Sequence, residues 1–122
     1  MIEGEILIEE QYQLYHGDCL EAMKKIPNES VDLIVTDPPY LMRYKSNYRK
    51  IKYEEITNDT NEQCDLISKY LEECYRVLKG DTAIYCFCSW HNIDFFKQEF
   101  EKYFKLKNII VWCKNNTSMG DL

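Results

Sequence analysis

Residues Asp37 to Tyr40, DPPY, place an acid, two prolines and a tyrosine directly after the apolar run from Val31 to Val35. Each proline fixes its own φ and lacks a backbone N–H, and the residue before a proline is held in extended geometry. The carbonyls of Asp37 and Pro38 therefore have no local donors. The pattern predicts a rigid set of oxygen acceptors, the Asp37 carboxylate plus a backbone oxygen, beside the flat ring of Tyr40. A planar group that carries an NH2 fits such a site.

The exocyclic amine of a nucleobase is such a group, and it is a poor nucleophile because its lone pair is spread into the ring. Two acceptors that bond its two hydrogens favour a tetrahedral nitrogen, whose lone pair can attack a methyl group in line. Positive charge then builds on nitrogen, and a fixed carboxylate and carbonyl stabilise that charge more than the ground state. Tyr40 would hold the base by stacking, worth about 1 to 3 kcal/mol per base. The alternative is that Asp37 only ends a strand and the prolines form an ordinary turn.

The charge distribution limits the partners. The 122-residue chain can build one small domain, and its net charge of −6 argues against a surface made mainly to bind phosphates. Residues 41–53, LMRYKSNYRKIKY, nevertheless contain no acid and interleave tyrosines with positive charge. Because residues 41–58 have no clean period, we predict a long loop, which is typically functional or disordered. The basic residues of this segment are Arg43, Lys45, Arg49, Lys50 and Lys52.

Compartment and metal chemistry are also bounded by the sequence. No apolar run approaches the roughly 20 residues that cross a bilayer, and the N-terminus is acidic, so we expect a cytoplasmic protein. His16 and His91 are too scattered for a metal site and are interpreted as structural or surface groups. The cysteines form no CxxC pair, which favours reduced, mostly buried thiols over a zinc or disulfide framework. They are Cys19, Cys64, Cys74, Cys86, Cys88 and Cys113.

Helical and strand patterns alternate along the chain. Apolar side chains recur every three to four residues after Asp18, which with Glu21 has the form of a helix cap, and Pro27 would end that helix. Strands that alternate with helices indicate an α/β fold with mostly parallel pairing. We predict about four strands and three helices in one domain, 1–122. The expected strands are 11–16, 31–35, 82–90 and 106–114; the expected helices are 18–26, 60–79 (ended by Gly80) and 93–104. Thr60 with Gln63 would cap the second helix, and Cys86 with Cys88 would face the core from one side of their strand. The apolar stripe expected on the second helix is Ile67, Tyr70, Leu71, Cys74 and Leu78.

DPPY, with its flanking segments, resembles the DNA amino-methyltransferases, which methylate adenine N6 or cytosine N4 using S-adenosylmethionine. The similarity runs from about Tyr12 onward, through GDCLE, VDLIVTDPPY, ECYRVLKGDTAIYCFCSW and NIIVWCKNN. It is strongest to the circularly permuted β-type group, in which the catalytic motif precedes the cofactor-binding glycine motif. An aspartate in the first position of the tetrapeptide tilts the target toward adenine. The resemblance implies an incomplete Rossmann-like methyltransferase sheet.

The resemblance also assigns roles by position. It places Asp37, Pro38, Pro39 and Tyr40 at the target amine. It places Asp18, with Cys19 and again Asp37, at the cofactor, although Asp18 as a simple helix cap is equally compatible with the sequence. The segment after Tyr40 resembles a loop that closes over base and DNA; the alternative is a solvated loop without a partner. The substrate-binding set that follows is Arg43, Lys45, Arg49, Lys50, Trp112 and Lys114, with Trp112 open to a core role instead.

The glycine-rich turn of the family, which cradles the methionine end of the cofactor, has no counterpart here. The four glycines, at 4, 17, 80 and 120, never form a GxG pattern. We therefore expect a truncated catalytic half of a DNA adenine methyltransferase of restriction-modification or phage type. Its partners would be double-stranded DNA and a second chain that supplies the missing region, or a second copy of itself. Two alternatives stay open: an inactive nucleic-acid-binding remnant, and a methyltransferase that acts on RNA or protein.

Overall fold

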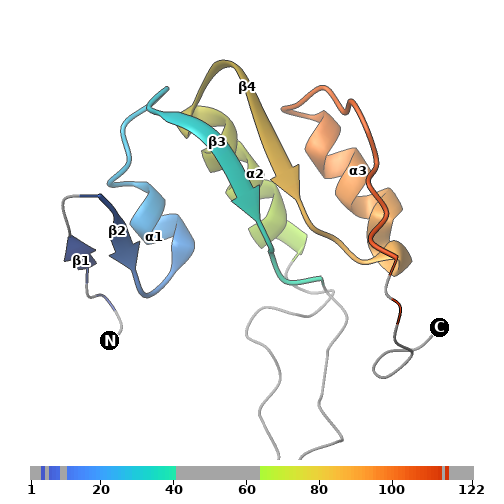
Figure 1. Ribbon diagram of the computed structural model, residues 1–122, viewed down its shortest axis with the longest axis horizontal. Helices are drawn as coiled ribbons and strands as arrows, with labels where there is room; N and C mark the ends of the chain where they lie inside the picture. The colour runs from blue at the N-terminus through green and yellow to red at the C-terminus, as the bar shows by residue number, and fades with distance from the viewer. Residues whose placement is uncertain (1–3, 5, 9–10, 41–63, 114, 116–122) are drawn as a thin grey trace, which may run out of the picture.

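The computed structural model describes residues 4, 6–8, 11–40, 64–113 and 115. Figure 1 shows a layered α/β arrangement in which helices lie beside short strands. The strands are β1 (Ile6–Ile8), β2 (Gln13–Tyr15), β3 (Val31–Thr36) and β4 (Leu78–Cys86). The helices are α1 (Cys19–Met23), α2 (Cys64–Val77), the 3-10 turn η2 (Trp90–Asn92) and α3 (Ile93–Glu101).

The strands form two separate sheets. β1 pairs antiparallel with β2, and β3 pairs parallel with β4. In the parallel pair Leu33 lies opposite Ala83 and Thr36 lies opposite Cys86, so both strands reach the same edge with their carboxyl ends. This shared edge places the residues after Thr36 beside those after Cys86.

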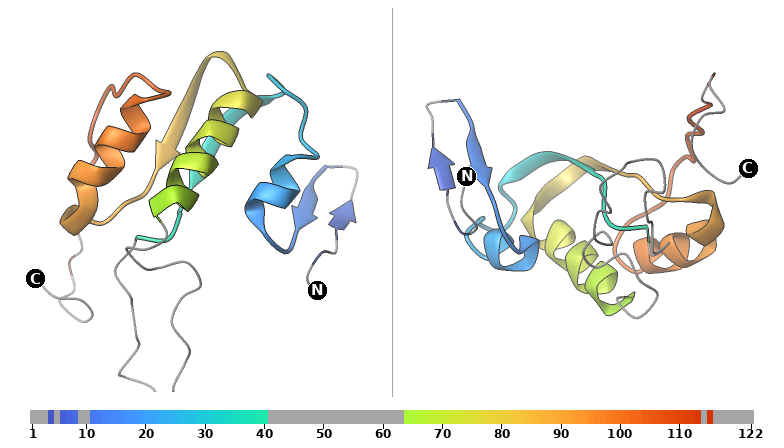
Figure 2. Two further views of the ribbon diagram at one scale, coloured as in Figure 1. Left: turned by 180° about the vertical axis from the view of Figure 1, so that it is seen from behind. Right: turned by 90° about the horizontal axis from the view of Figure 1, so that it is seen from below.

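The core lies on one side of the β3–β4 sheet, where α2 and α3 pack (Figure 2). The apolar stripe expected on the second helix is buried at Ile67, Leu71 and Cys74 of α2. Phe96 of α3 packs against the amino-terminal half of this stripe, at Ile67 and Leu71. A second cluster joins Cys74 and Val77 to Met23 of α1. The hydrophobic spacing of both long helices therefore identified the face that the core uses.

The opposite face of the β3–β4 sheet is uncovered in the part of the chain that the structure describes. Leu33 and Val35 of β3 alternate with inward Ile34 and Thr36, as the period of two requires. Leu33 is 52% exposed and Val35 is 62% exposed, and Tyr85 of β4 is 51% exposed. An apolar strip of this kind is typical of a surface that another structural layer covers.

Arg76 fixes α1 against α2. Its guanidinium donates to the Met23 carbonyl at 2.8 Å and to the Ile26 carbonyl at 2.9 Å, at the end of α1, and it also contacts Glu73 at 2.7 Å. The Met23 carbonyl also accepts from the Ile26 backbone N–H at 2.9 Å, so the arginine adds a second donor there and links the residues that end α1 to α2. The position of α1 matters because Asp18 is its N-cap.

The sheet prediction is only partly confirmed. The α/β class is confirmed, but β1 was not predicted, the described strands are divided between two sheets, and only β3–β4 is parallel. The expected strand at 106–114 is wrong over 106–113, which are described without helix or strand. Gly80 does not end the helix: α2 ends at Val77, and Gly80 lies inside β4 because Leu78 already pairs with Val31.

The expectation of mostly buried thiols is also corrected. Cys74 is buried, but Cys19 and Cys113 are exposed, and the remaining three are half-buried. Within the described residues no group of three His, Cys, Asp or Glu side chains is arranged to hold a metal ion. Helix length and hydropathy identify no candidate membrane span among the described helices. The loop predicted at 41–58 and the cap predicted at Thr60 and Gln63 lie outside the described residues.

Candidate active site

The DPPY tetrapeptide begins where β3 ends. The backbone N–H of Phe87 donates to the Thr36 carbonyl at 2.9 Å, which extends the contact between β3 and β4 past their last paired residues. Asp37 therefore follows an anchored strand end, next to the segment that leaves β4. In open α/β sheets ligands bind outside the carboxyl ends of the strands, so a ligand site is expected at this edge.

Asp37 is exposed, whereas Pro38 is buried and Pro39 is half-buried. The phenol of Tyr40 donates a hydrogen bond to Oδ1 of the Asp37 carboxylate. None of the ion pairs between described residues involves Asp37. The acid is thus oriented by a neutral partner, and no hydrogen bond between described residues uses its Oδ2.

The phenol of Tyr40 is a hydrogen-bond donor and not a base. Burial, followed by the hydrogen bond to Asp37 and the negative charge of that carboxylate, raises the pKa of Tyr40 well above its ordinary value. A protonated phenol is the form that can hold Oδ1. Tyr40 therefore contributes orientation of the acid and a ring surface.

Two side chains distant in sequence hold the tetrapeptide from either end. The hydroxyls of Thr36 and Tyr70 lie 2.5 Å apart, which joins the residue before Asp37 to α2. At the other end, Nδ2 of Asn92 donates to the Tyr40 carbonyl at 2.6 Å. Both bonds are part-buried, where a hydrogen bond exchanges less readily with water.

The thiols of Cys74 and Cys86 are uncharged at neutral pH. Burial raises the pKa of the Cys86 thiol to about 12, with smaller effects from neighbouring thiols and Asp37, and burial raises the pKa of Cys74 to about 11. A thiolate is the reactive form of cysteine, so these groups are not nucleophiles at neutral pH. The core role expected for Cys86 and Cys88 fits their packing against Ile67, Leu71 and Phe96.

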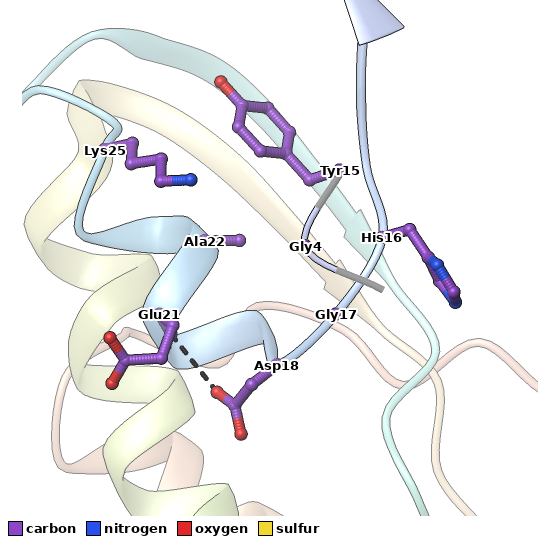
Figure 3. A pocket seen from close by; sticks show the side chains of 8 residues that line it. All are labelled: Gly4, Tyr15, His16, Gly17, Asp18, Glu21, Ala22 and Lys25. Carbon is purple, nitrogen blue, oxygen red and sulfur yellow. Dashed lines mark hydrogen bonds between the residues drawn. The ribbon is translucent and has the colours of Figure 1, made fainter. Parts of the chain in front are cut away.

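A second feature lies at the amino end of α1. Asp18 caps the helix: its Oδ1 accepts from Leu20 N at 2.8 Å and from Glu21 N at 3.2 Å. This confirms the cap predicted at Asp18. Figure 3 shows the Asp18 and Glu21 carboxylates together at this end of α1. They border a hollow of about 80 Å³ that is also lined by Gly4, Tyr15, His16, Gly17, Ala22 and Lys25.

The remaining predicted residues that the structure describes do not line the hollow, although Cys19 directly follows the Asp18 cap. Cys19 is exposed, and partial burial together with the charge of Asp18 raises its pKa. Trp112 is 74% exposed and lies near the Phe87 ring, 6.5 Å between centroids, so the core role left open for it is wrong. The DPPY residues do not line the hollow beside Asp18. Arg43, Lys45, Arg49, Lys50 and Lys114 lie outside the described residues.

Sequence reasoning missed Tyr70 and Asn92 as neighbours of the tetrapeptide. Tyr70 was assigned to the apolar stripe of the helix, and its hydroxyl was the unused signal, because a buried tyrosine needs a polar partner. Asn92 precedes α3 at the N-cap position but makes no side-chain capping bond. Asparagine there normally bonds the first turn of the helix, so only the fold reveals its bond to Tyr40.

Comparison with known proteins places these features in a family. A family profile described as DNA methylase, of the N6 and N4 type, matches residues 31–121, which include DPPY. The chain is 34% identical over 112 residues to type II methyltransferase M.HinfI of Haemophilus influenzae, covering 82% of this chain and 31% of that protein. It is 35% identical over 108 residues to DNA adenine methyltransferase YhdJ of Escherichia coli (strain K12), covering 87% and 34%.

Type II methyltransferase M.BamHI of Bacillus amyloliquefaciens is 40% identical over 84 residues, which cover 65% of this chain and 18% of that protein. The chain thus spans about a third of the length of the first two relatives (31% and 34%). The family match covers most of the chain and includes the edge at which Asp37 and Tyr40 meet. This chain belongs to the N6/N4 family of DNA amino-methyltransferases.

Proposed function

We propose that this chain is the catalytic portion of a cytoplasmic DNA adenine methyltransferase that uses S-adenosylmethionine. One observation carries the proposal: an exposed carboxylate at the carboxyl edge of a parallel strand pair, oriented by Tyr40 and free of ion pairs within the described residues. An acid used only to end a strand has no need of a phenol that fixes its direction. The same arrangement suits an acceptor for an amine.

The chemistry of the site follows from these groups. Oδ2 of Asp37 accepts one N–H of the target amine, and a backbone carbonyl of the tetrapeptide accepts the other. The nitrogen lone pair then points out of the ring plane and can attack a methyl carbon in line. Positive charge would grow on nitrogen as the new N–C bond forms and the methyl–sulfur bond of S-adenosylmethionine breaks, releasing S-adenosylhomocysteine, and the carboxylate would stabilise that charge. The extra proton leaves to solvent after transfer, so Asp37 is unchanged at the end.

We assign one end of the cofactor to the hollow beside Asp18. Oδ1 of Asp18 is occupied by the helix cap, while its Oδ2 can accept from an amine; Glu21 adds a second carboxylate whose Oε1 already accepts from Lys24 Nζ at 2.5 Å. A group with an exocyclic amine and hydroxyls, such as adenosine, suits this acceptor-rich rim. S-adenosylmethionine would supply an electrophilic methyl group. Cys19 would contribute at the rim, next to the cap.

Substrate and base identity rest on the relatives and on charge. The name DNA adenine methyltransferase belongs to YhdJ, and the aspartate that opens DPPY favours adenine in this chain too. We assign DNA contact to Arg43, Lys45, Arg49 and Lys50 of the 41–58 segment, and to Trp112 and Lys114. We also propose that a second chain, or a second copy of this one, packs on the open face of the β3–β4 sheet, where Leu33 and Val35 are exposed.

Methyl transfer from labelled S-adenosylmethionine to DNA tests the proposal. Asp37→Asn keeps the shape of the acid but removes its charge and one acceptor, so transfer should fall by at least about 100-fold, the scale of losing one aligned electrostatic group. Asp32→Asn is the matched control, since Asp32 lies on β3, the strand that Asp37 follows, is exposed, and forms an ion pair with Lys79 among the described residues. Equal activity of Asp37→Asn and the parent would overturn the assignment.

Calorimetric titration with S-adenosylhomocysteine separates the alternatives. Micromolar binding supports a working cofactor site. Salt-sensitive DNA binding without cofactor binding, unaffected by Asp37→Asn, would identify a nucleic-acid-binding remnant instead. Transfer to RNA or protein but not to DNA would retain the site and change the substrate. A mismatch at the target should strengthen DNA binding, because the base must leave the stack.

A further inference from the structure

The turn that follows β4 presents an aromatic side chain at the same edge as DPPY. Trp90 of η2 is 68% exposed. Its ring lies on the His91 imidazole, with 3.8 Å between centroids and 31° between planes. One face of Trp90 is thus supported by His91, and the ring is held outward instead of packing into the core.

The support beneath Trp90 is itself anchored. Oγ of Ser89 accepts from the His91 backbone N–H at 3.3 Å and lies 3.2 Å from Nδ1 of the same residue. Ser89 therefore fixes both the backbone and the ring of His91. A supported ring loses little further freedom when a ligand stacks on it, which favours binding.

The turn is joined directly to the catalytic tetrapeptide. Asn92 donates its amide to the Tyr40 carbonyl at 2.6 Å instead of capping α3. This bond links positions 52 residues apart and sets Trp90 two residues from a contact with DPPY. Upstream, the bond from Phe87 N to Thr36 O ties the same two segments. The turn and the tetrapeptide therefore lie side by side at the carboxyl ends of β3 and β4.

We propose that Trp90 is a stacking surface for an unpaired nucleobase in the DNA that presents the target base. The proposal rests on the proposed function, because it uses the same edge and the same substrate. Extruding a base breaks its stacking with its neighbours, and a supported indole replaces part of that contact. Stacking on an aromatic side chain tolerates any base, so Trp90 adds affinity without sequence preference.

Tryptophan fluorescence tests this directly, because the chain contains only two tryptophans. In a Trp112→Phe background Trp90 is the sole reporter. A short oligodeoxyadenylate should quench its emission, whereas an abasic oligonucleotide of equal length carries the same charge and should not. Equal quenching by both would show a phosphate effect and overturn the proposal. Emission that is blue-shifted and shielded from acrylamide before DNA is added would show that protein covers Trp90, and would also overturn it.

Affinity gives the second measurement. Trp90→Ala should weaken binding of the oligodeoxyadenylate about 5- to 150-fold, which is the 1 to 3 kcal/mol of one stacked base at 1.4 kcal/mol per tenfold. Trp90→Phe should recover most of it. Tyr12→Ala, which removes a 57% exposed aromatic ahead of β2, is the matched control and should bind as the parent does. Unchanged affinity in Trp90→Ala would refute stacking.

The two proposals fail separately. Loss of stacking while methyl transfer still depends on Asp37 would remove Trp90 from the site and leave the enzyme assignment intact. Stacking that persists when neither S-adenosylhomocysteine binding nor methyl transfer can be detected would leave a base-binding edge in a protein that is not an active methyltransferase.

Discussion

The Thr36–Tyr70 pair connects the strand that carries the candidate acid to the helix beneath it, and its energy can be measured. The two hydroxyl oxygens lie 2.5 Å apart and are part-buried. Burial raises the pKa of Tyr70 above its ordinary value, so the phenol stays protonated. The bond is therefore one between two neutral groups, which contributes about 0.5 to 1.5 kcal/mol net.

Removing one hydroxyl costs more than the bond contributes, because its partner is left buried and unpaired at about 1 to 3 kcal/mol. Since the pair is only part-buried, we expect Tyr70→Phe and Thr36→Val each to lower the free energy of unfolding by about 1 to 2 kcal/mol. The double variant leaves no unpaired hydroxyl. Its loss should be smaller than the sum of the single losses by about 1 kcal/mol.

Urea unfolding followed by far-UV circular dichroism measures all four proteins under one condition. A change in midpoint with a constant slope identifies a change in stability alone. Losses that add within about 0.3 kcal/mol would show that the hydroxyls are not coupled and would refute this account of the strand end. If the coupling is present, Tyr70→Phe should also slow methyl transfer, because Thr36 directly precedes Asp37.

Three further perturbations follow from the packing and charges. Leu71→Ala should lower the free energy of unfolding by about 2 to 5 kcal/mol, because Leu71 is 1% exposed in the core. Leu14→Ala is the control: Leu14 is 51% exposed, so the free energy of unfolding should change by less than about 0.5 kcal/mol. Equal losses of stability in the two variants would contradict the burial of Leu71. Arg76 hydrogen bonds lower the pKa of Glu73, so the stability from this pair is present above the ordinary glutamate value of about 4.3 and is lost as pH falls through the lowered value. Glu73→Gln should flatten that acid limb of the stability curve, and an unchanged limb would argue against the pair. The purified chain should self-associate through its open sheet face, and Val35→Lys should shift it toward monomer in sedimentation; a stable monomeric parent with a sharp, high melting transition would argue against this.

Local patterns predicted the elements whose residues contact near neighbours. Asp18 caps α1 by accepting from the backbone N–H three residues later, and the buried stripe of α2 followed from the spacing of its apolar residues. The failures concern pairing at a distance. Residues 109–112 have strand-like composition, yet Ile110 and Val111 are 76% and 75% exposed, and they pair with nothing among the described residues. A strand needs a partner edge, and composition does not say whether one is present.

The same distinction between local patterns and distant contacts applies to the candidate site. The prolines stiffen DPPY locally, but its orientation comes from Tyr70 and Asn92, which are 34 and 52 residues from their partners. Among the described residues, the groups that orient Asp37 and its flanking backbone are Thr36, Tyr40, Tyr70 and Asn92. The hollow beside Asp18 sits on α1, next to a β1–β2 sheet that does not pair with β3–β4. The proposed base-binding edge and the proposed cofactor hollow therefore lie on separate sheets, so a substitution that unfolds β1–β2 should weaken cofactor binding more than it disturbs Asp37.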